Sequence, residues 1–193
     1  MGNTKSDGFA LDLPAIRQRA RLHLDDGAVT RGYRLDVATV VGLLNDSLAT
    51  ELVCVLRYKR HAFMSAAIGG IPGFAVHEEL MTHAAQEMAH ADRFAQRIVQ
   101  LGGEPDFDPR NLSVRSHSEY APGAGLEDML REDLIAERIA IDTYHEIIGF
   151  LGDRDPTTRR LFEDTLMQEE EHADDLSDFL RRLGLGVSAH AGR

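Results

Sequence analysis

The chain contains no tryptophan and a single cysteine, Cys54, among its 193 residues, and aromatic residues make up only 6% of it. One cysteine allows no intrachain disulfide and no zinc or iron–sulfur site built from cysteines. So few aromatic side chains argue against a surface on which nucleic-acid bases stack. The low cysteine content favours a reduced, cytoplasmic setting.

Long apolar runs are missing as well. No stretch approaches the roughly 20 consecutive apolar residues of a membrane helix. The first residues, MGNTKSDGFALDLP, lack the apolar segment of a secretory signal. We therefore expect no association with a membrane. Hydrophobic residues at 43% and charged residues at 27% are ordinary for one folded domain.

Basic residues are outnumbered by acidic ones, 21 to 32, which gives a net charge of −11 beside nine histidines. This balance argues against a general DNA-binding surface, and it suits the attraction of cations. Carboxylates and imidazoles together are the ligands of many transition-metal sites. An acidic protein without any metal site has the same composition, so the pattern along the chain must discriminate between the two.

The sequence divides into three parts. Residues 1–34 hold six basic and four acidic residues and are expected to form an N-terminal extension with one short helix around 13–22. Residues 35–184 are expected to form a helical bundle, and residues 185–193 a C-terminal tail. The extension has a charge of +2, which could touch DNA, whereas the remainder of the chain is strongly acidic.

Four long apolar stripes with spacings of three and four residues predict helices at roughly 36–66, 75–101, 126–151 and 157–183. The run Gly69–Gly73 is read as the stop of the first helix. Asp155 and Pro156 suit the N-cap and first position of the last helix. Residues 104–125 form the longest connection. We therefore predict an all-α, antiparallel four-helix bundle with one long crossover connection.

One carboxylate interrupts each apolar stripe near its middle. These four residues are Glu51, Glu87, Glu137 and Glu169. Burying four unpaired carboxylates together is untenable without cations. Two of them are followed three residues later by a histidine, His90 after Glu87 and His172 after Glu169, and such a pair shares one helix face.

One glutamate from each of two helices, with a Glu-x-x-His pair from each of the other two, is the ligand set of a carboxylate-bridged di-iron or di-manganese centre. Four carboxylates balance the charge of two divalent ions, and the imidazoles give each ion a nitrogen ligand. Open coordination positions would admit dioxygen or peroxide. The pattern therefore predicts a metal centre inside the bundle.

A family resemblance follows from these motifs. The stretch QEMAHADRF, from Gln86 to Phe94, resembles the Glu-Met-x-His-Ala-Asp-Arg signature of bacterioferritin. Glu169-Glu170-Glu171-His172 resembles the Glu-Glu-Gly-His motif of that family, and Asp133-Leu134 resembles its third-helix pattern. The resemblance covers residues 36–181 and implies a ferritin-like bundle, ferroxidase activity and assembly into a hollow shell.

The resemblance also implies the roles of single residues. It makes Glu51, Glu87, His90, Glu137, Glu169 and His172 the di-iron ligands. It leaves open whether Glu87 bridges the metals together with Glu137 or with Glu169. Tyr58, seven residues after Glu51, would form a hydrogen bond or donate an electron near the iron, or would be an ordinary core tyrosine.

Four further residues lie near the motifs, and two of them, Met88 and His83, have two interpretations each. Met88 corresponds to the methionine that ligates haem b between two bacterioferritin subunits, and it could also be an interface methionine without haem. Tyr144 lies seven residues after Glu137, just as Tyr58 lies seven residues after Glu51. His83, one turn before Glu87, would be an entry or accessory metal site, or a partly buried, hydrogen-bonded histidine. Cys54 is expected to be a small core residue rather than a ligand.

Three departures from bacterioferritin concern the size of the shell. No apolar stripe for a fifth helix follows Leu183, the crossover is longer, and an N-terminal extension is present. These features resemble twelve-subunit, starvation-protein-like members of the superfamily, although the cysteine pair common among them is missing. We therefore expect a shell of twelve subunits rather than twenty-four.

The expected function is oxidation of Fe(II) by dioxygen or hydrogen peroxide at a di-iron site within each subunit, with storage of Fe(III) inside the shell. One alternative is a di-manganese catalase or peroxidase, in which Mn replaces iron. Another is a DNA-protecting cage.

Overall fold

The computed structural model describes residues 10–22, 24 and 27–185. All its regular elements are helices, in the order α1 (Leu13–Leu22), α2 (Val37–Ile68), α3 (Gly70–Gln100), α4 (Leu112–Arg115), α5 (Leu126–Leu151) and α6 (Pro156–Arg182). The described residues contain no strand. The predicted all-α class is confirmed. Most of the predicted C-terminal tail and the first nine residues of the predicted extension lie outside the described residues.

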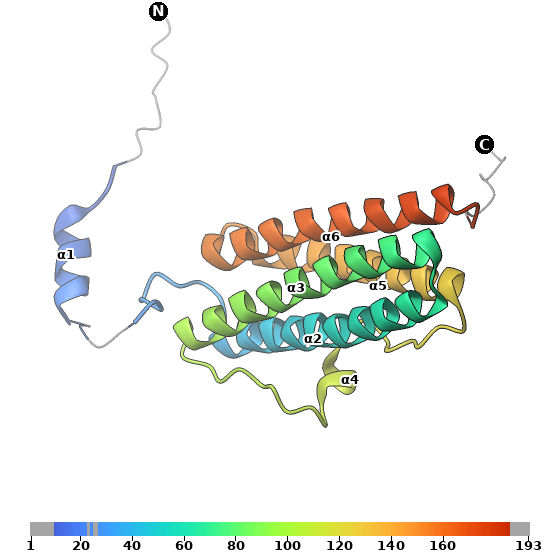
Figure 1. Ribbon diagram of the computed structural model, residues 1–193. Coiled ribbons are helices and arrows are strands. Elements are labelled where there is room, and N and C mark those ends of the chain that lie inside the picture. The colour runs from blue at the N-terminus through green and yellow to red at the C-terminus, as the bar shows by residue number, and fades with distance from the viewer. Residues whose placement is uncertain (1–9, 23, 25–26, 186–193) are drawn as a thin grey trace, which may run out of the picture.

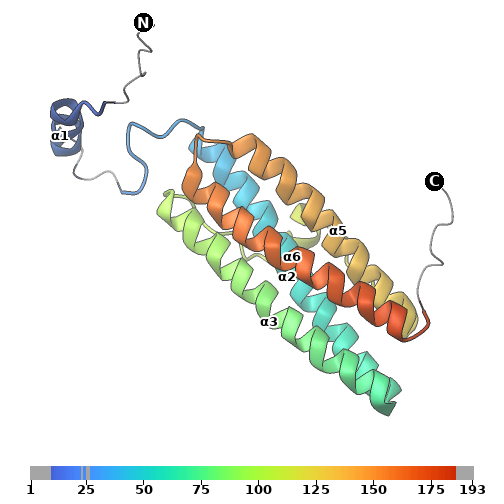
Figure 2. The same ribbon diagram turned by 90° about the horizontal axis from the view of Figure 1, so that it is seen from above.

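Four long helices form the bundle (Figure 1). α2 packs antiparallel to α3, and α5 packs antiparallel to α6. The connection from α3 to α5 runs the length of the bundle along the outside of α2, with α4 within it (Figures 1 and 2). The predicted bundle with one long crossover is therefore the observed fold. α1 stands apart from the bundle and buries none of its residues.

The predicted helix boundaries hold closely except at one turn. α3 begins at Gly70 rather than near residue 75, because the glycine- and proline-rich run that ends α2 also starts α3. Gly69 has φ of 77°, a left-handed conformation that glycine adopts without strain. Pro72 is tolerated because it lies in the first turn of a helix. At Gly73, a Cβ atom would lie 2.5 Å from the carbonyl oxygen of Ser65, so only glycine permits this close packing.

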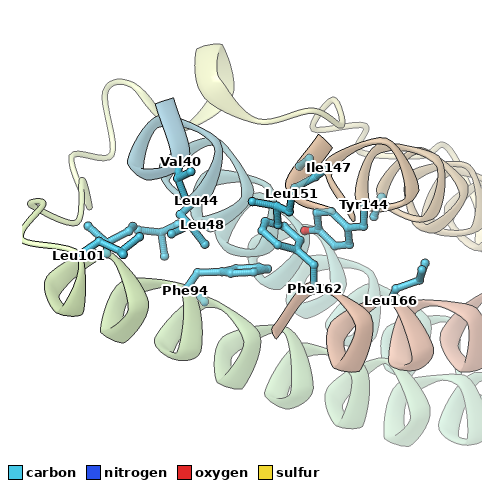
Figure 3. Close-up of a cluster of buried hydrophobic side chains, with 13 residues drawn as sticks. Val40, Leu44, Leu48, Phe94, Leu101, Tyr144, Ile147, Leu151, Phe162 and Leu166 are labelled. Carbon is cyan, nitrogen blue, oxygen red and sulfur yellow. The ribbon is translucent and has the colours of Figure 1, made fainter. Parts of the chain in front are cut away.

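Hydrophobic side chains form two main clusters, one toward each end of the bundle. The first is drawn in Figure 3 and includes Leu44, Phe94, Tyr144 and Phe162. The second lies toward the α2–α3 turn and includes Tyr58, Leu80, Leu130 and Leu176. The polar residues predicted to bind metal come between these clusters along every helix, so apolar packing closes the centre at both ends.

Among the described residues, one helix, α2, is long and apolar enough to cross a membrane, with a mean hydropathy of 1.5 over its best window. More than half of that window is buried inside the bundle, and the core helix of a bundle passes the same test. The length and composition of α2 are therefore weak evidence for a membrane span.

Candidate metal centre

The six predicted ligands lie together in the middle of the bundle. Glu51 comes from α2, Glu87 and His90 from α3, Glu137 from α5, and Glu169 and His172 from α6. All six are buried. Each helix therefore brings its carboxylate to the same level along the bundle, as the interrupted apolar stripes predict.

Their ligand atoms fall into two groups that overlap. Glu51, Glu87, His90 and Glu169 form one group, and Glu87, Glu137, Glu169 and His172 form the other, with the atoms of each group within 4.8 Å of one another. Glu87 and Glu169 belong to both groups. Shared carboxylates between two otherwise separate ligand sets are the arrangement of a bridged two-metal centre.

Both histidines turn the same ring atom toward the carboxylates. His90 Nδ1 lies 3.1 Å from Glu87 Oε2, 3.4 Å from Glu51 Oε2 and 3.0 Å from Glu169 Oε1. His172 Nδ1 lies 3.2 Å from Glu87 Oε1, 3.5 Å from Glu169 Oε2 and 3.9 Å from Glu137 Oε2. Each Nδ1 therefore faces the space enclosed by three carboxylates.

Two glutamines hold the far sides of these rings. Gln168 Oε1 lies 2.7 Å from His90 Nε2, and Gln86 Oε1 lies 2.9 Å from His172 Nε2. Since the glutamine oxygen is an acceptor, Nε2 of each ring donates to it, which leaves Nδ1 as the atom that faces the carboxylates. Burial opposes a charge on His172, but the neighbouring carboxylates of Glu169 and Glu87 raise its pKa to about 9, so Nδ1 gives up a proton when a cation takes its place. Sequence reasoning missed the role of the glutamines, although the repeat Gln-Glu-x-x-His occurs in both motifs and was a signal for it.

The two tyrosines next to the centre bind across the bundle. Tyr58 of α2 donates to Glu137 Oε1 on α5, and Tyr144 of α5 donates to Glu51 Oε1 on α2. Each tyrosine therefore bonds the glutamate of the opposite helix, not the one seven residues before it. Each bond satisfies one carboxylate oxygen and leaves the other, Oε2, facing a histidine of the centre.

Because the carboxylates of the cluster are buried close together, the pKa values of two of them are raised. Burial, followed by the charges of Glu169 and Glu87, raises the pKa of Glu51 well above its usual range. Burial and the same two neighbours raise the pKa of Glu137. Such groups hold protons until a cation replaces them.

Several buried polar atoms of the cluster have no hydrogen-bond partner in the described structure. Three of them are Glu87 Oε1, Glu169 Oε1 and His172 Nδ1. Buried polar atoms are normally satisfied, and a role in binding an ion is one recognised reason for an exception. The donor set, its charge and these free atoms all fit a pair of divalent cations.

The remaining sequence-predicted residues lie around the centre. Cys54 is buried, with its sulfur 3.4 Å from a guanidinium nitrogen of Arg57, and it is in neither ligand group. Met88 lies on the outer surface of α3 with 39% of the residue exposed, so it is accessible to a second subunit or to haem. Haem at Met88 stays a prediction. His83 is fully buried and stacks on His172 with ring centroids 4.1 Å apart.

A buried ion pair next to the centre was not predicted. Arg57 Nε donates to Asp133 Oδ1 at 2.9 Å, and His61 Nδ1 lies 2.9 Å from the same carboxylate. All three side chains are completely buried. In the sequence, Asp133 stands out only as part of a family pattern. Its place four residues before Glu137 on an apolar face is the signal that it needs a buried partner.

Comparison with known proteins agrees with this fold. The family model described as ferritin-like domain matches residues 41–185. The bacterioferritin of Mycobacterium avium is 30% identical over 156 residues, which cover 80% of this chain and 92% of that protein. A DNA protection during starvation protein of Pyrococcus furiosus is 28% identical over 72% of this chain and 75% of its own length.

Among solved structures, a dodecameric thioferritin from Bacteroides fragilis, described as a bacterioferritin-related protein, superposes with a TM-score of 0.73. It is 28% identical, and the match covers 87% of this chain and 95% of that one. With the family match, the bacterioferritin relative and this superposition, the chain belongs to the ferritin-like family.

Proposed function

We propose that the protein is a ferroxidase that oxidises Fe(II) at the buried centre and stores the Fe(III) within a homo-oligomeric shell. The observation that carries this proposal is the pair of overlapping ligand groups that share Glu87 and Glu169. Glu87 and Glu169 would be shared by the two ions. Glu51 with His90 would complete one position, and Glu137 with His172 would complete the other.

Two Fe(II) ions held by these residues would each lose one electron, and the two electrons, with two protons, would reduce dioxygen to hydrogen peroxide or hydrogen peroxide to two water molecules. The chain prepares the site for them. Gln86 and Gln168 bind Nε2 of the histidines and so keep Nδ1 aimed inward. Glu51 and Glu137 release protons when cations enter, so metal binding strengthens as pH rises. The two hydrophobic clusters exclude bulk water from the ends of the centre.

The test is the ferric absorbance that develops after Fe(II) is added in air to the full-length protein. We expect Glu87→Ala and His172→Ala to abolish the fast phase, because each removes a ligand from the buried centre. Glu170→Ala on α6 and His145→Ala on α5 are the controls, since both side chains are exposed, and they should keep the wild-type rate. Wild-type rates in the two ligand variants would overturn the proposal.

Manganese chemistry is the alternative that uses the same ligands. A di-manganese catalase would be isolated with Mn and would release oxygen from hydrogen peroxide without added iron. Elemental analysis of the purified protein with an oxygen-release assay separates the two. The Met-containing motif around Met88 resembles bacterioferritin, which favours iron.

DNA protection is a second candidate, because one relative carries that name and the predicted extension, residues 1–34, has a charge of +2. A mobility-shift assay at physiological salt tests it. The net charge of −11 leads us to expect no shift.

A further inference from the structure

A third group of ligand-type side chains lies beside the buried centre. His83 of α3 is one turn before Glu87, and its ring stacks on that of His172. Only 1% of its side chain is exposed, yet neither ring nitrogen has a hydrogen-bond partner. A buried imidazole with two unsatisfied nitrogens is unfavourable, because it has lost its hydrogen bonds to water. Something else must bind at least one of them.

Two carboxylates face His83 Nε2. Glu79 Oε1, one turn earlier on α3, lies 3.3 Å away, and Asp175 Oδ2, on α6, lies 3.6 Å away. One ligand atom from each of the three residues lies within 4.8 Å of the others. Ligand atoms about 2.1 Å from a tetrahedral metal ion are separated from one another by about 3.4 Å. The two nitrogen–oxygen distances match that separation.

The three residues differ in their access to solvent. The side chains of Glu79 and Asp175 are 35% and 54% exposed, whereas those of the six ligands in the buried centre are almost fully covered. A cation can therefore reach this group directly from solution, with water filling the remaining coordination positions.

We propose that Glu79, His83 and Asp175 form an accessory site for one divalent transition-metal ion, distinct from the two-ion centre. One imidazole nitrogen and two carboxylate oxygens suit Fe(II), Mn(II), Co(II) or Zn(II). The bound ion satisfies His83 Nε2 and offsets the charge of the two carboxylates. The site concerns binding alone, so it does not depend on ferroxidase activity at the buried centre.

The test counts Co(II) bound per chain in the full-length assembly, by equilibrium dialysis followed by elemental analysis. Glu79→Gln with Asp175→Asn removes both carboxylate ligands at partly exposed positions while leaving buried His83 in place. Glu78→Gln with Asp174→Asn is the control, because it makes the same change of charge at neighbouring exposed positions. Circular dichroism and assembly mass check that both variants keep the fold.

We expect the control to bind as many ions as the wild type and the Glu79/Asp175 variant to bind one fewer per chain. A second set of the same proteins also carries Glu87→Ala, which disables the buried centre. The difference in bound ions between the control and the Glu79/Asp175 variant is thereby measured without that centre. Failure of the two-ion centre would lower the count of every protein and leave that difference intact. Equal counts in the wild type, the control and the Glu79/Asp175 variant would overturn the accessory site.

Discussion

At the scale of single residues, the metal-facing nitrogen of each histidine is set by a glutamine on the opposite helix. Gln86 of α3 accepts from His172 of α6, and Gln168 of α6 accepts from His90 of α3. The two helices therefore orient each other's ligands. Partners of this kind fix the tautomer of a ligating histidine and raise its basicity.

Replacing Gln86 by leucine removes the acceptor for His172 Nε2 and keeps a side chain of similar size. We expect a loss of about 10–100-fold in metal affinity, the usual effect of removing such a partner. Gln86→Glu keeps an acceptor oxygen and should retain most of the affinity. Competition with a fluorescent chelator measures both. Gln96→Leu, on the exposed face of α3, is the control, and an equal loss there would contradict the assigned role.

The six ligands could be predicted from sequence because spacing along a helix determines which side chains share its face. Contacts between helices could not, because they depend on how the helices are rotated and offset in the bundle. The pairing of Tyr58 with Glu137, and of Tyr144 with Glu51, illustrates this limit. The same limit applies to Asp175, which lies far from His83 in the sequence and faces it from α6.

At the scale of elements, α2 has a second polar face that holds the crossover. Asn45 bonds the backbone at Glu104 and Asp106, and Thr50 bonds His117. Farther along, Arg57 donates to the carbonyl of Glu119 at 3.0 Å. A connection of this length is therefore fixed by a row of hydrogen bonds rather than by regular structure of its own.

Asp133 supports the last part of this row, because it pairs with Arg57 inside the bundle. Asp133→Ala leaves the buried guanidinium without its counterion. We expect a loss of about 3–5 kcal/mol in the free energy of unfolding, which is typical when one partner of a buried pair is removed. Urea unfolding followed by circular dichroism measures it. Asp142→Ala, at an exposed position of the same helix, should change little, and equal stabilities of the two variants would contradict a structural role for the pair.

The start of α6 provides a pH-dependent contribution to stability. Burial opposes ionisation of Asp155, but bonds from the Thr158 side chain and backbone and from Tyr33, with the charge of Arg97, hold its pKa below the usual range. A carboxylate with a lowered pKa stabilises the fold above its unfolded pKa of about 3.9 and loses that contribution as the pH falls.

Asp155→Asn keeps an N-cap side chain but does not titrate. We expect the variant to be less stable than the wild type near pH 6, with the difference shrinking as the pH is lowered toward 3. Thermal unfolding across this range tests the expectation. Asp92→Asn, at an exposed position, serves as the control, and a difference that stays constant with pH would contradict the assigned contribution.

Sequence patterning predicted the long helices and the ten-residue α1 well, and the four-residue α4 not at all. α5 was predicted at the residues where it occurs, because a sustained apolar stripe lies between clear glycine boundaries. α4 spans only four residues and has no stripe to detect. The early start of α3 was missed because glycine and proline in a first turn look the same in sequence as a helix stop.

At the scale of the whole molecule, the proposed homo-oligomeric shell is open to a direct test. The thioferritin on which the chain superposes is dodecameric, so we propose twelve subunits. Twelve chains of 21.4 kDa would give about 257 kDa (12 × 21.4 kDa). Light scattering coupled to size-exclusion chromatography measures this mass, and a value twice as large would indicate twenty-four subunits instead.

The central claim is that Glu87 and Glu169 bridge two metal ions within one chain. Anomalous diffraction from crystals loaded with Fe(II) or Mn(II) tests it most directly. We predict two peaks about 3.5–4 Å apart, the spacing of two-metal sites, with Glu87 and Glu169 between them, His90 on one ion and His172 on the other. A single peak, or no peak within reach of these side chains, would contradict the account.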